Sequence, residues 1–154
     1  MLKTKPFDET PGHCGVASFK IVLNYFGIKK TEKELTKLCG WNRTDGVSTK
    51  AILKVAKKMG FKGFIQDFSD IKDLKKYVLR KELPVVVDWF STNQGHSSVV
   101  IDIDEENVYL QDPDIGHIRA MEIEVFKRVW FDFSGPFLCA KKDIIIRRMM
   151  VLYK

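Results

Sequence analysis

Cys14 is the residue whose type and position most favour chemistry. It begins a stretch rich in apolar residues, in the segment GHCGVASFKIVLNYFG, which is typical of a largely buried helix. A thiol in the first turn of a helix lies beside unpaired backbone N–H groups and the positive end of the helix dipole, and both favour the thiolate. The same N–H groups can stabilise an oxyanion on a carbonyl that the sulfur attacks. The alternative is a small buried cysteine without reactivity.

A nucleophilic cysteine needs a base close by in space, and the chain has three histidines. His13 adjoins Cys14, so we expect its ring to point elsewhere. His117 follows a turn and is typical of a surface or strand-end residue. His96 lies where a glycine-bearing turn leads into a buried strand, a place where a rigid scaffold presents functional side chains. We predict that His96 is the base; a strand-end histidine bonded to the backbone is the alternative.

The third group of such a site orients the imidazole and is a carboxylate or an amide on an adjacent strand. Asp112 ends the segment VYLQD, which follows the strand that His96 begins, so hairpin pairing would bring the two side chains together. Asp114 is the competitor, but it lies beyond Pro113, inside the turn. We predict that Asp112 is the orienting group; a plain Asp-Pro turn is the alternative.

The elements that position these residues change character midway along the chain. Apolar periodicity and capping residues predict four helices in the first half: 14–26, one capped by Thr31 with Glu34, one capped by Ser48, and one from Ser69 to about 81. From Leu83 onward, short β-branched or alternating runs predict strands, with a short helix at 124–130 and a last strand over 143–153. This order predicts the α+β class, with a helical N-terminal half packed on a C-terminal antiparallel sheet.

Length and composition set the limits of the function. With 154 residues, we expect a single domain over residues 1–154. The net charge of +6 does not indicate nucleic-acid binding, because lysines at 50, 54, 57 and 58 follow the spacing of a solvated helix face. The N-terminus has no apolar signal core, and no run reaches the roughly 18 apolar residues of a membrane span. We therefore expect a cytoplasmic protein without direct membrane insertion.

Cofactors are not implied by the sequence. The three cysteines Cys14, Cys39 and Cys139 are odd in number and far apart, which predicts free thiols. The cysteines and histidines show no C-x-x-C or H-x-x-x-H spacing of a zinc site, and no glycine-rich phosphate loop occurs in the sequence.

Most of the chain resembles the bacteriocin-processing, or double-glycine leader, cysteine peptidases and their stand-alone relatives with a papain-like fold. The segments that carry this resemblance are HCGVASFKIVLNYFG, DGVSTKAILKVAKKMGF, LPVVVDW, GHSSVVIDID, VYLQDPDIG and VFKRVW. The resemblance implies that Cys14 is the nucleophile, His96 the base and Asp112 the residue that orients it. It also implies a peptide or protein substrate, such as a leader peptide cut after a Gly-Gly pair, with the chain acting alone or beside a separate membrane exporter.

One position departs from the pattern of these peptidases. They usually carry a glutamine six residues before the nucleophile, whose amide donates to the oxyanion, and this oxyanion-hole position is Asp8 here. An ionised Asp8 would accept rather than donate, and losing one such donor costs about 2.7 to 4 kcal/mol of transition-state stabilisation. The oxyanion could still be stabilised in three ways: by a protonated Asp8, by a local shift that brings in Thr10, or by backbone N–H groups alone.

The sequence therefore leads to one main expectation and two alternatives. The main expectation is thiol-dependent peptide hydrolysis by Cys14, His96 and Asp112 through an acyl-enzyme. The first alternative is a catalytically impaired pseudo-peptidase that binds a peptide or a partner protein. The second is a cysteine acyltransferase or amidase that uses the same three residues on another substrate.

Overall fold

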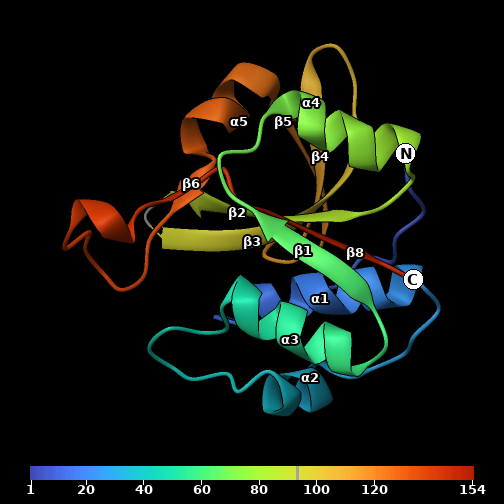
Figure 1. Cartoon of the computed structure of the whole chain (residues 1–154), viewed down its shortest axis with the longest axis vertical. Coiled ribbons are helices and arrows are strands. Elements are labelled where there is room, and N and C mark those ends of the chain that lie inside the picture. Colours follow the sequence, from blue (N-terminus) through green and yellow to red (C-terminus); the bar gives the residue numbers. More distant parts are fainter. Residues whose placement is uncertain (93) are drawn as a thin grey trace.

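The computed structural model describes residues 1–92 and 94–154, which form the elements labelled in Figure 1. The helices are α1 (Cys14–Tyr25), α2 (Glu32–Leu38), α3 (Thr49–Lys58), α4 (Ile71–Lys75) and α5 (Ile123–Val129), with a π-helical turn at Lys76–Arg80 and a 3-10 turn at Lys141–Asp143. The strands are β1 (Lys62–Gln66), β2 (Val85–Ser91), β3 (Gln94–Ile103), β4 (Asn107–Asp112), β5 (His117–Glu122), β6 (Phe131–Asp132), β7 (Ile145–Ile146) and β8 (Met149–Tyr153).

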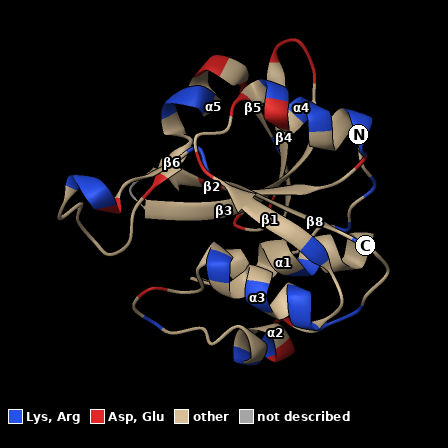
Figure 2. Cartoon of the chain, in the orientation of Figure 1, with Lys and Arg blue, Asp and Glu red and all other residues tan. Residues whose placement is uncertain are grey.

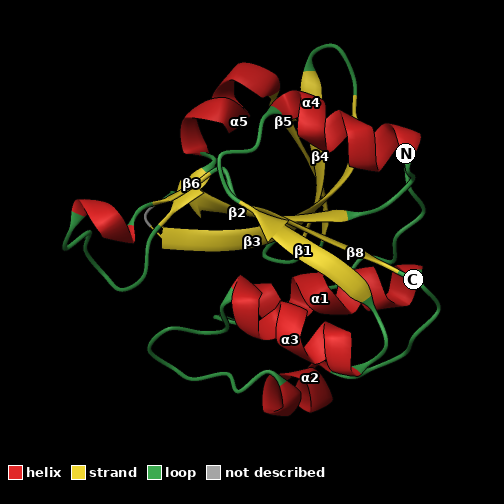
Figure 3. Cartoon of the chain, viewed as in Figure 1, coloured by secondary structure: helices red, strands yellow, loops and turns green. Residues whose placement is uncertain are grey.

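The main sheet separates two layers of helices. Its strand order is β1-β8-β2-β3-β4-β5, and all of these pairs are antiparallel. Helices α1, α2 and α3 lie on one side of the sheet, and α4 and α5 lie on the other (Figures 1 and 3). Successive residues of β2 supply both layers, because Val86 joins the cluster that contains Phe19 while Val85 and Val87 join the cluster that contains Trp130. The predicted α+β class is confirmed.

Helices α2 and α3 begin at the capping residues that the sequence predicts. The Thr31 hydroxyl accepts a hydrogen bond from the Glu34 backbone N–H, and the Glu34 carboxylate accepts one from the Thr31 N–H, which completes a capping box for α2. The Ser48 hydroxyl accepts from the Ala51 N–H and caps α3. The four lysines at 50, 54, 57 and 58 are exposed, and Figure 2 shows Lys and Arg distributed over several helices rather than gathered on one.

The structure differs from the sequence prediction in three places. A strand, β1, lies within the mostly helical first half and pairs with β8 at one edge of the sheet. Asp70 rather than Ser69 caps α4, because its carboxylate accepts from the Asp73 N–H, whereas the Ser69 hydroxyl donates to the Gln66 carbonyl. The predicted last strand is split into β7 and β8, since Arg147 has a left-handed backbone with φ of 47°.

Close approach of β1 and β8 at Gly63 generates a stability prediction. A Cβ at this position would lie 2.5 Å from the Val151 carbonyl oxygen and 2.7 Å from a Leu152 side-chain carbon. The carbonyl can move only if the strand pairing is disturbed, so we expect Gly63→Ala to lower the free energy of unfolding by about 1 to 3 kcal/mol in urea titrations. Lys62→Ala is the matched control, because Lys62 is exposed and its loss should change stability by less than about 0.5 kcal/mol. Equal stability of the two variants would contradict the β1–β8 register.

Candidate active site

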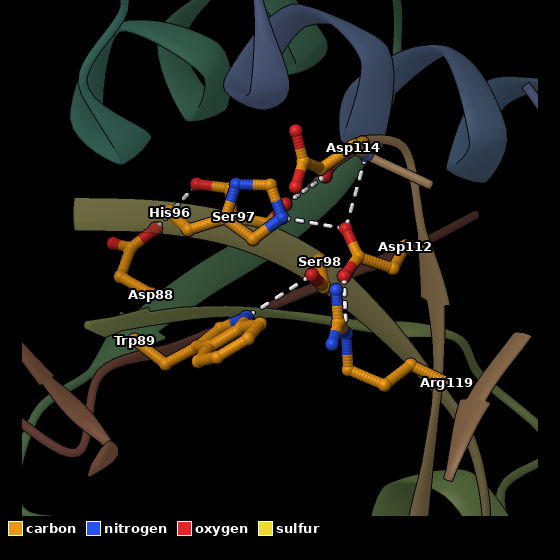
Figure 4. Close-up of polar contacts among 9 residues, drawn as sticks. Asp88, Trp89, His96, Ser97, Ser98, Asp112, Asp114 and Arg119 are labelled. Atoms are coloured by element: carbon orange, nitrogen blue, oxygen red, sulfur yellow. Dashed lines mark hydrogen bonds and ion pairs between the residues drawn. The ribbon is translucent and has the colours of Figure 1, made fainter. Parts of the chain in front are cut away.

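His96 and Asp112 are in direct contact. The His96 Nε2 atom lies 2.5 Å from the Asp112 Oδ1 atom, and both residues are almost completely buried, with 5% and 0% of their surfaces exposed. Figure 4 shows the Asp112 carboxylate between the His96 ring and the Arg119 guanidinium. The hairpin that the sequence predicts therefore brings these two residues together.

The strand register explains why three residues from three strands meet here. In the β3–β4 pair, Val99 lies opposite Gln111, so continuation of the same register places Asp112 opposite Ser98, two residues from His96. In the β4–β5 pair, Asp112 lies opposite His117, two residues from Arg119. Residues two apart on a strand point to the same side, so His96 and Arg119 are both diagonal neighbours of Asp112.

Asp112 accepts three hydrogen bonds, which keep its buried carboxylate ionised. Besides His96, Arg119 Nε donates to Oδ2 at 2.7 Å, and the Asp114 backbone N–H donates to Oδ1 at 3.1 Å. Burial alone would raise the pKa of Asp112, but the hydrogen bond and charge of His96, with help from Arg119 and Asp114, lower it to about 2. The aspartate is thus a fixed negative charge behind the imidazole.

Cys14 reaches the same imidazole from the N-terminal end of α1. Ser18, one turn further along α1, donates from its hydroxyl to the Ser97 carbonyl at 3.0 Å. Residues four apart in a helix share a face, so this buried bond directs the Cys14 side of α1 towards the start of β3. Interaction with Cys14 is among the causes that raise the pKa of His96. The Cys14 side chain is partly exposed and therefore open to a substrate.

The His96 ring is held in a form that favours the imidazolium. Burial lowers its pKa, but hydrogen bonds and charge interactions with Asp112 and Cys14 outweigh this effect and raise the pKa well above its ordinary value of 6.5. The Trp89 ring packs edge-on against His96 at 5.3 Å, and Trp89 Nε1 donates to the Ser98 hydroxyl at 3.0 Å. A cationic imidazole next to a thiol is the arrangement that activates a cysteine nucleophile.

A second buried carboxylate, that of Asp88, holds the residue that follows His96. Asp88 accepts hydrogen bonds from the Ser97 hydroxyl at 2.8 Å and from the Thr49 hydroxyl at the start of α3. Gly95 precedes His96, and any Cβ there would clash with the Asp132 carboxylate. A larger residue at Gly95 would therefore displace the Asp132 side chain, and the backbone that presents His96 is held by its pairing with β2 and by the bonds of Asp88 to Ser97 and Thr49.

The side chains of the competing residues take no part in this contact network. His13 stacks on Trp41 with ring centroids 4.3 Å apart, so its ring points elsewhere, as predicted. His117 is exposed. Asp114 binds Asp112 through its backbone rather than its carboxylate.

The two acidic residues before Cys14 face opposite ways. Asp8 is exposed, and its Cβ is 3.2 Å from the place that a Cβ of Gly116 would occupy, so Asp8 packs beside the turn after β4. Glu9 is half-buried, its backbone N–H donates to the Pro113 carbonyl at 2.9 Å, and its Oε2 atom is buried. The oxyanion-hole role of Asp8 stays a prediction of the sequence.

Sequence reasoning did not identify Arg119, Asp88 or Glu9 as parts of the site. The chain carried a signal for Arg119, because a basic residue in the alternating strand IRAMEI that follows the Asp-Pro turn is well placed to reach Asp112. A signal for Glu9 was also present. Phe7 packs against the core, and in an extended chain Glu9 lies on the same side as Phe7, whereas Asp8 lies on the other.

Metal-binding clusters and membrane-spanning helices are both absent from the part of the chain that the structure describes. Within residues 1–92 and 94–154, no cluster of three or more His, Cys, Asp or Glu side chains could hold a metal ion. Over the same ranges, no helix has the length and apolar character needed to cross a bilayer.

Ionisation of Asp112 predicts a specific dependence of stability on pH. The carboxylate has a folded-state pKa of about 2 against an ordinary 3.8, so its contribution is present above pH 3.8 and is lost as the pH falls through 2. The stability advantage of the wild type over Asp112→Asn should therefore shrink by on the order of 2 kcal/mol between pH 4.5 and pH 2 in urea titrations. A constant difference over that range would show that Asp112 is not an ionised, hydrogen-bonded partner of His96.

The chain is similar to known proteins over most of its length. Residues 8–142 match the model of the Peptidase C39 family. An uncharacterized protein of Methanothermobacter thermautotrophicus is 30% identical over 131 residues, which cover 84% of this chain and 82% of that protein. An uncharacterized protein of Methanothermobacter marburgensis is 28% identical over the same shares of the two chains.

Solved structures share the fold at low sequence identity. A double glycine motif protease from an AMS/PCAT transporter, in complex with the leader peptide, superposes with a TM-score of 0.74 at 21% identity, covering 98% of this chain and 91% of that one. The peptidase domain of Streptococcus ComA, a bi-functional ABC transporter, gives 0.73 at 21% identity, covering 99% and 98%. The predicted papain-like fold is confirmed, and the family match over residues 8–142 shows that this chain belongs to the peptidase C39 family.

Proposed function

We propose that this protein hydrolyses peptide bonds with Cys14 as nucleophile, His96 as base and later acid, and Asp112 as the group that orients the imidazole. The observation that carries the proposal is the buried contact of His96 with the ionised Asp112, together with the interaction with Cys14 that helps to raise the pKa of His96. A binding module without chemistry has no physical need for this chain of contacts. The family of cysteine peptidases to which the chain belongs supports the same reaction.

The reaction follows from the positions of these groups. The Cys14 thiolate forms a bond to the carbonyl carbon, and the electron pair of the C=O bond moves to the oxygen. When this intermediate collapses, the C–N bond breaks and the leaving amine takes the proton from His96. A water molecule then gives a proton to His96 as its oxygen attacks the thioester carbon, and the C–S bond breaks, which releases the acid and regenerates the Cys14 thiolate beside the imidazolium. Asp112 keeps the ring in place through both steps.

The substrate class that we propose is a leader or other peptide cut after small residues of the Gly-Gly type. Two structural neighbours support it, since one is a double glycine motif protease bound to a leader peptide and the other is a peptidase domain of an ABC transporter. A separate membrane exporter would be a partner of such an enzyme. The experiment is cleavage of a synthetic peptide that contains one Gly-Gly pair, followed by mass spectrometry. We expect a cut after the second glycine that is absent in Cys14→Ala.

The pairing of Cys14 with His96 is tested without any substrate. Iodoacetamide alkylation at pH 6, read by peptide mass spectrometry, should modify Cys14 at least about ten-fold faster than the exposed Cys139, because a neighbouring imidazolium favours the thiolate. His96→Ala should remove this advantage. His117→Ala is the matched control, since His117 is exposed and outside the contact network, and it should leave the rate unchanged. Equal rates at Cys14 in the wild type and His96→Ala would remove the basis of the proposed function.

A further inference from the structure

We propose that Glu9, in its protonated form, donates a hydrogen bond to the oxyanion that forms when Cys14 attacks a carbonyl. This inference deepens the proposed function and rests on it for its biological meaning. It assigns to Glu9 the role that sequence spacing indicates for Asp8, because Asp8 is exposed whereas one carboxyl oxygen of Glu9 is buried.

The segment around Glu9 is held in place from two directions. The Glu9 backbone N–H donates to the Pro113 carbonyl at 2.9 Å, directly after Asp112. Thr10 is held by the Glu32 carboxylate of α2, which accepts from the Thr10 N–H at 3.0 Å and from its hydroxyl at 2.5 Å. Glu9 is therefore fixed between the turn that follows Asp112 and the first turn of α1. Such anchoring gives a donor the preorganisation that oxyanion stabilisation requires.

The Glu9 carboxyl group lies within the electrostatic reach of charged residues of the site. The side-chain charges that influence it most are those of His96 from β3, Asp114 from the turn after β4 and Asp112 from β4. Each of them belongs to the site or adjoins it.

One oxygen of Glu9 has no partner. The Oε2 atom is buried and makes no hydrogen bond to any residue within 1–92 and 94–154. A buried polar atom without a partner costs about 1 to 3 kcal/mol, which calls for an explanation in a well-packed structure. An oxyanion that formed beside Cys14 would accept from an Oε2–H group and satisfy it.

The electrostatic surroundings supply the proton that this role needs. Burial, followed by the charges of Asp114 and Asp112, raises the pKa of Glu9 from 4.5 to about 7, although His96 and the His13 N–H oppose the shift. A carboxylic acid with a raised pKa is a donor below that value and an acceptor above it. The donor is therefore present at pH 6 and is lost as the pH rises through about 7, where an ionised Glu9 would repel the oxyanion.

Two reagents separate oxyanion stabilisation from simple reactivity of the thiol. p-Nitrophenyl acetate transfers its acetyl group to sulfur through a tetrahedral oxyanion, with p-nitrophenolate as the leaving group. Iodoacetamide reacts at a CH₂ carbon by displacement of iodide and forms no oxyanion. The ratio of the acetylation rate to the alkylation rate at Cys14, read by peptide mass spectrometry of the full chain, therefore measures the oxyanion donor alone. Cys139 in the same molecule gives the reference ratio of an exposed thiol.

We expect Glu9→Ala to lower this ratio at pH 6 by on the order of a hundred-fold, the usual cost of one oxyanion donor. Glu9→Gln, which keeps a donor of similar shape without a titrating proton, should retain the ratio at pH 6 and exceed the wild type at pH 8.5. The wild-type ratio should fall as the pH rises through about 7, and that of Glu9→Gln should not.

Three results would overturn the assignment of Glu9: a Glu9→Ala ratio within two-fold of the wild type, a loss in Asp8→Ala instead, or the same pH dependence in Glu9→Gln as in the wild type. The third comparison decides the matter even if Glu9→Ala does not fold. Cleavage of the Gly-Gly peptide by the same samples keeps the two proposals apart. A lower acetylation-to-alkylation ratio in Glu9→Ala, without cleavage of the peptide by the wild type, supports Glu9 as the donor and contradicts the peptidase function. Cleavage by the wild type, with an unchanged ratio in Glu9→Ala, supports the peptidase function and contradicts Glu9 as the donor.

Discussion

The contact between His96 Nε2 and Asp112 Oδ1 is the interaction to which the other features of the site are adjusted. Both side chains are buried, so each loses its hydration and depends on the other for compensation. The remaining acceptor positions of Asp112 are filled by Arg119 and by the Asp114 N–H, which makes the buried charge tolerable. With Asp112 fixed as an anion, a protonated His96 becomes the stable form of the ring, and the thiol of Cys14 gains a cationic neighbour.

The fold achieves this contact by joining two layers with different roles. The sheet sets the positions of His96, Asp112 and Arg119 relative to one another through the registers of three adjacent strands. Helix α1 brings Cys14 from the other layer, and the buried bond from Ser18 to the Ser97 carbonyl connects the two. A second bond, from the Glu9 N–H to the Pro113 carbonyl, connects the segment that precedes Cys14 to the turn after β4.

The acidic residues in and around the site also differ in the pKa of their carboxyl groups. Asp112 has three donors and stays ionised, whereas Glu9 and Asp132 lack such compensation, and burial raises the pKa of each to about 7. Carboxyl groups in one small region of the molecule thus have different pKa values, about 2 for Asp112 and about 7 for Glu9 and Asp132. An ionised acid suits the orientation of an imidazole, and a protonated acid suits donation to a developing negative charge.

The sequence was sufficient for those parts of the structure that depend on local signals. The capping residues Thr31 and Ser48 and the apolar stretch after Cys14 are interpreted from neighbours within one or two turns, and the helices form there. The short strand β1 was missed because its pairing with β8 involves residues almost ninety positions away. Arg147 interrupts the last strand through a left-handed backbone that its residue type does not favour.

The sequence also predicted those parts of the site that depend on local signals, and it missed those that depend on contacts between distant segments. The residue types and their flanking turns indicated Cys14, His96 and Asp112, and the structure brings these three together. The placement of Arg119 and Glu9 depends on strand register and on the side to which an extended segment faces, and neither can be obtained by counting residues back from the cysteine. Geometry of this kind appears only when the strands and the lead-in to α1 are placed together.

The central claim, a buried imidazolium held by Asp112 beside Cys14, is tested most directly by ¹⁵N NMR of the His96 ring over a pH titration. The account predicts that both ring nitrogens of His96 carry protons at pH 7.5, because the pKa of the imidazole is raised well above 6.5. It also predicts that Asp112→Asn lowers this pKa. A neutral His96 ring at pH 7.5, titrating at or below 6.5 in the wild type, would contradict the account.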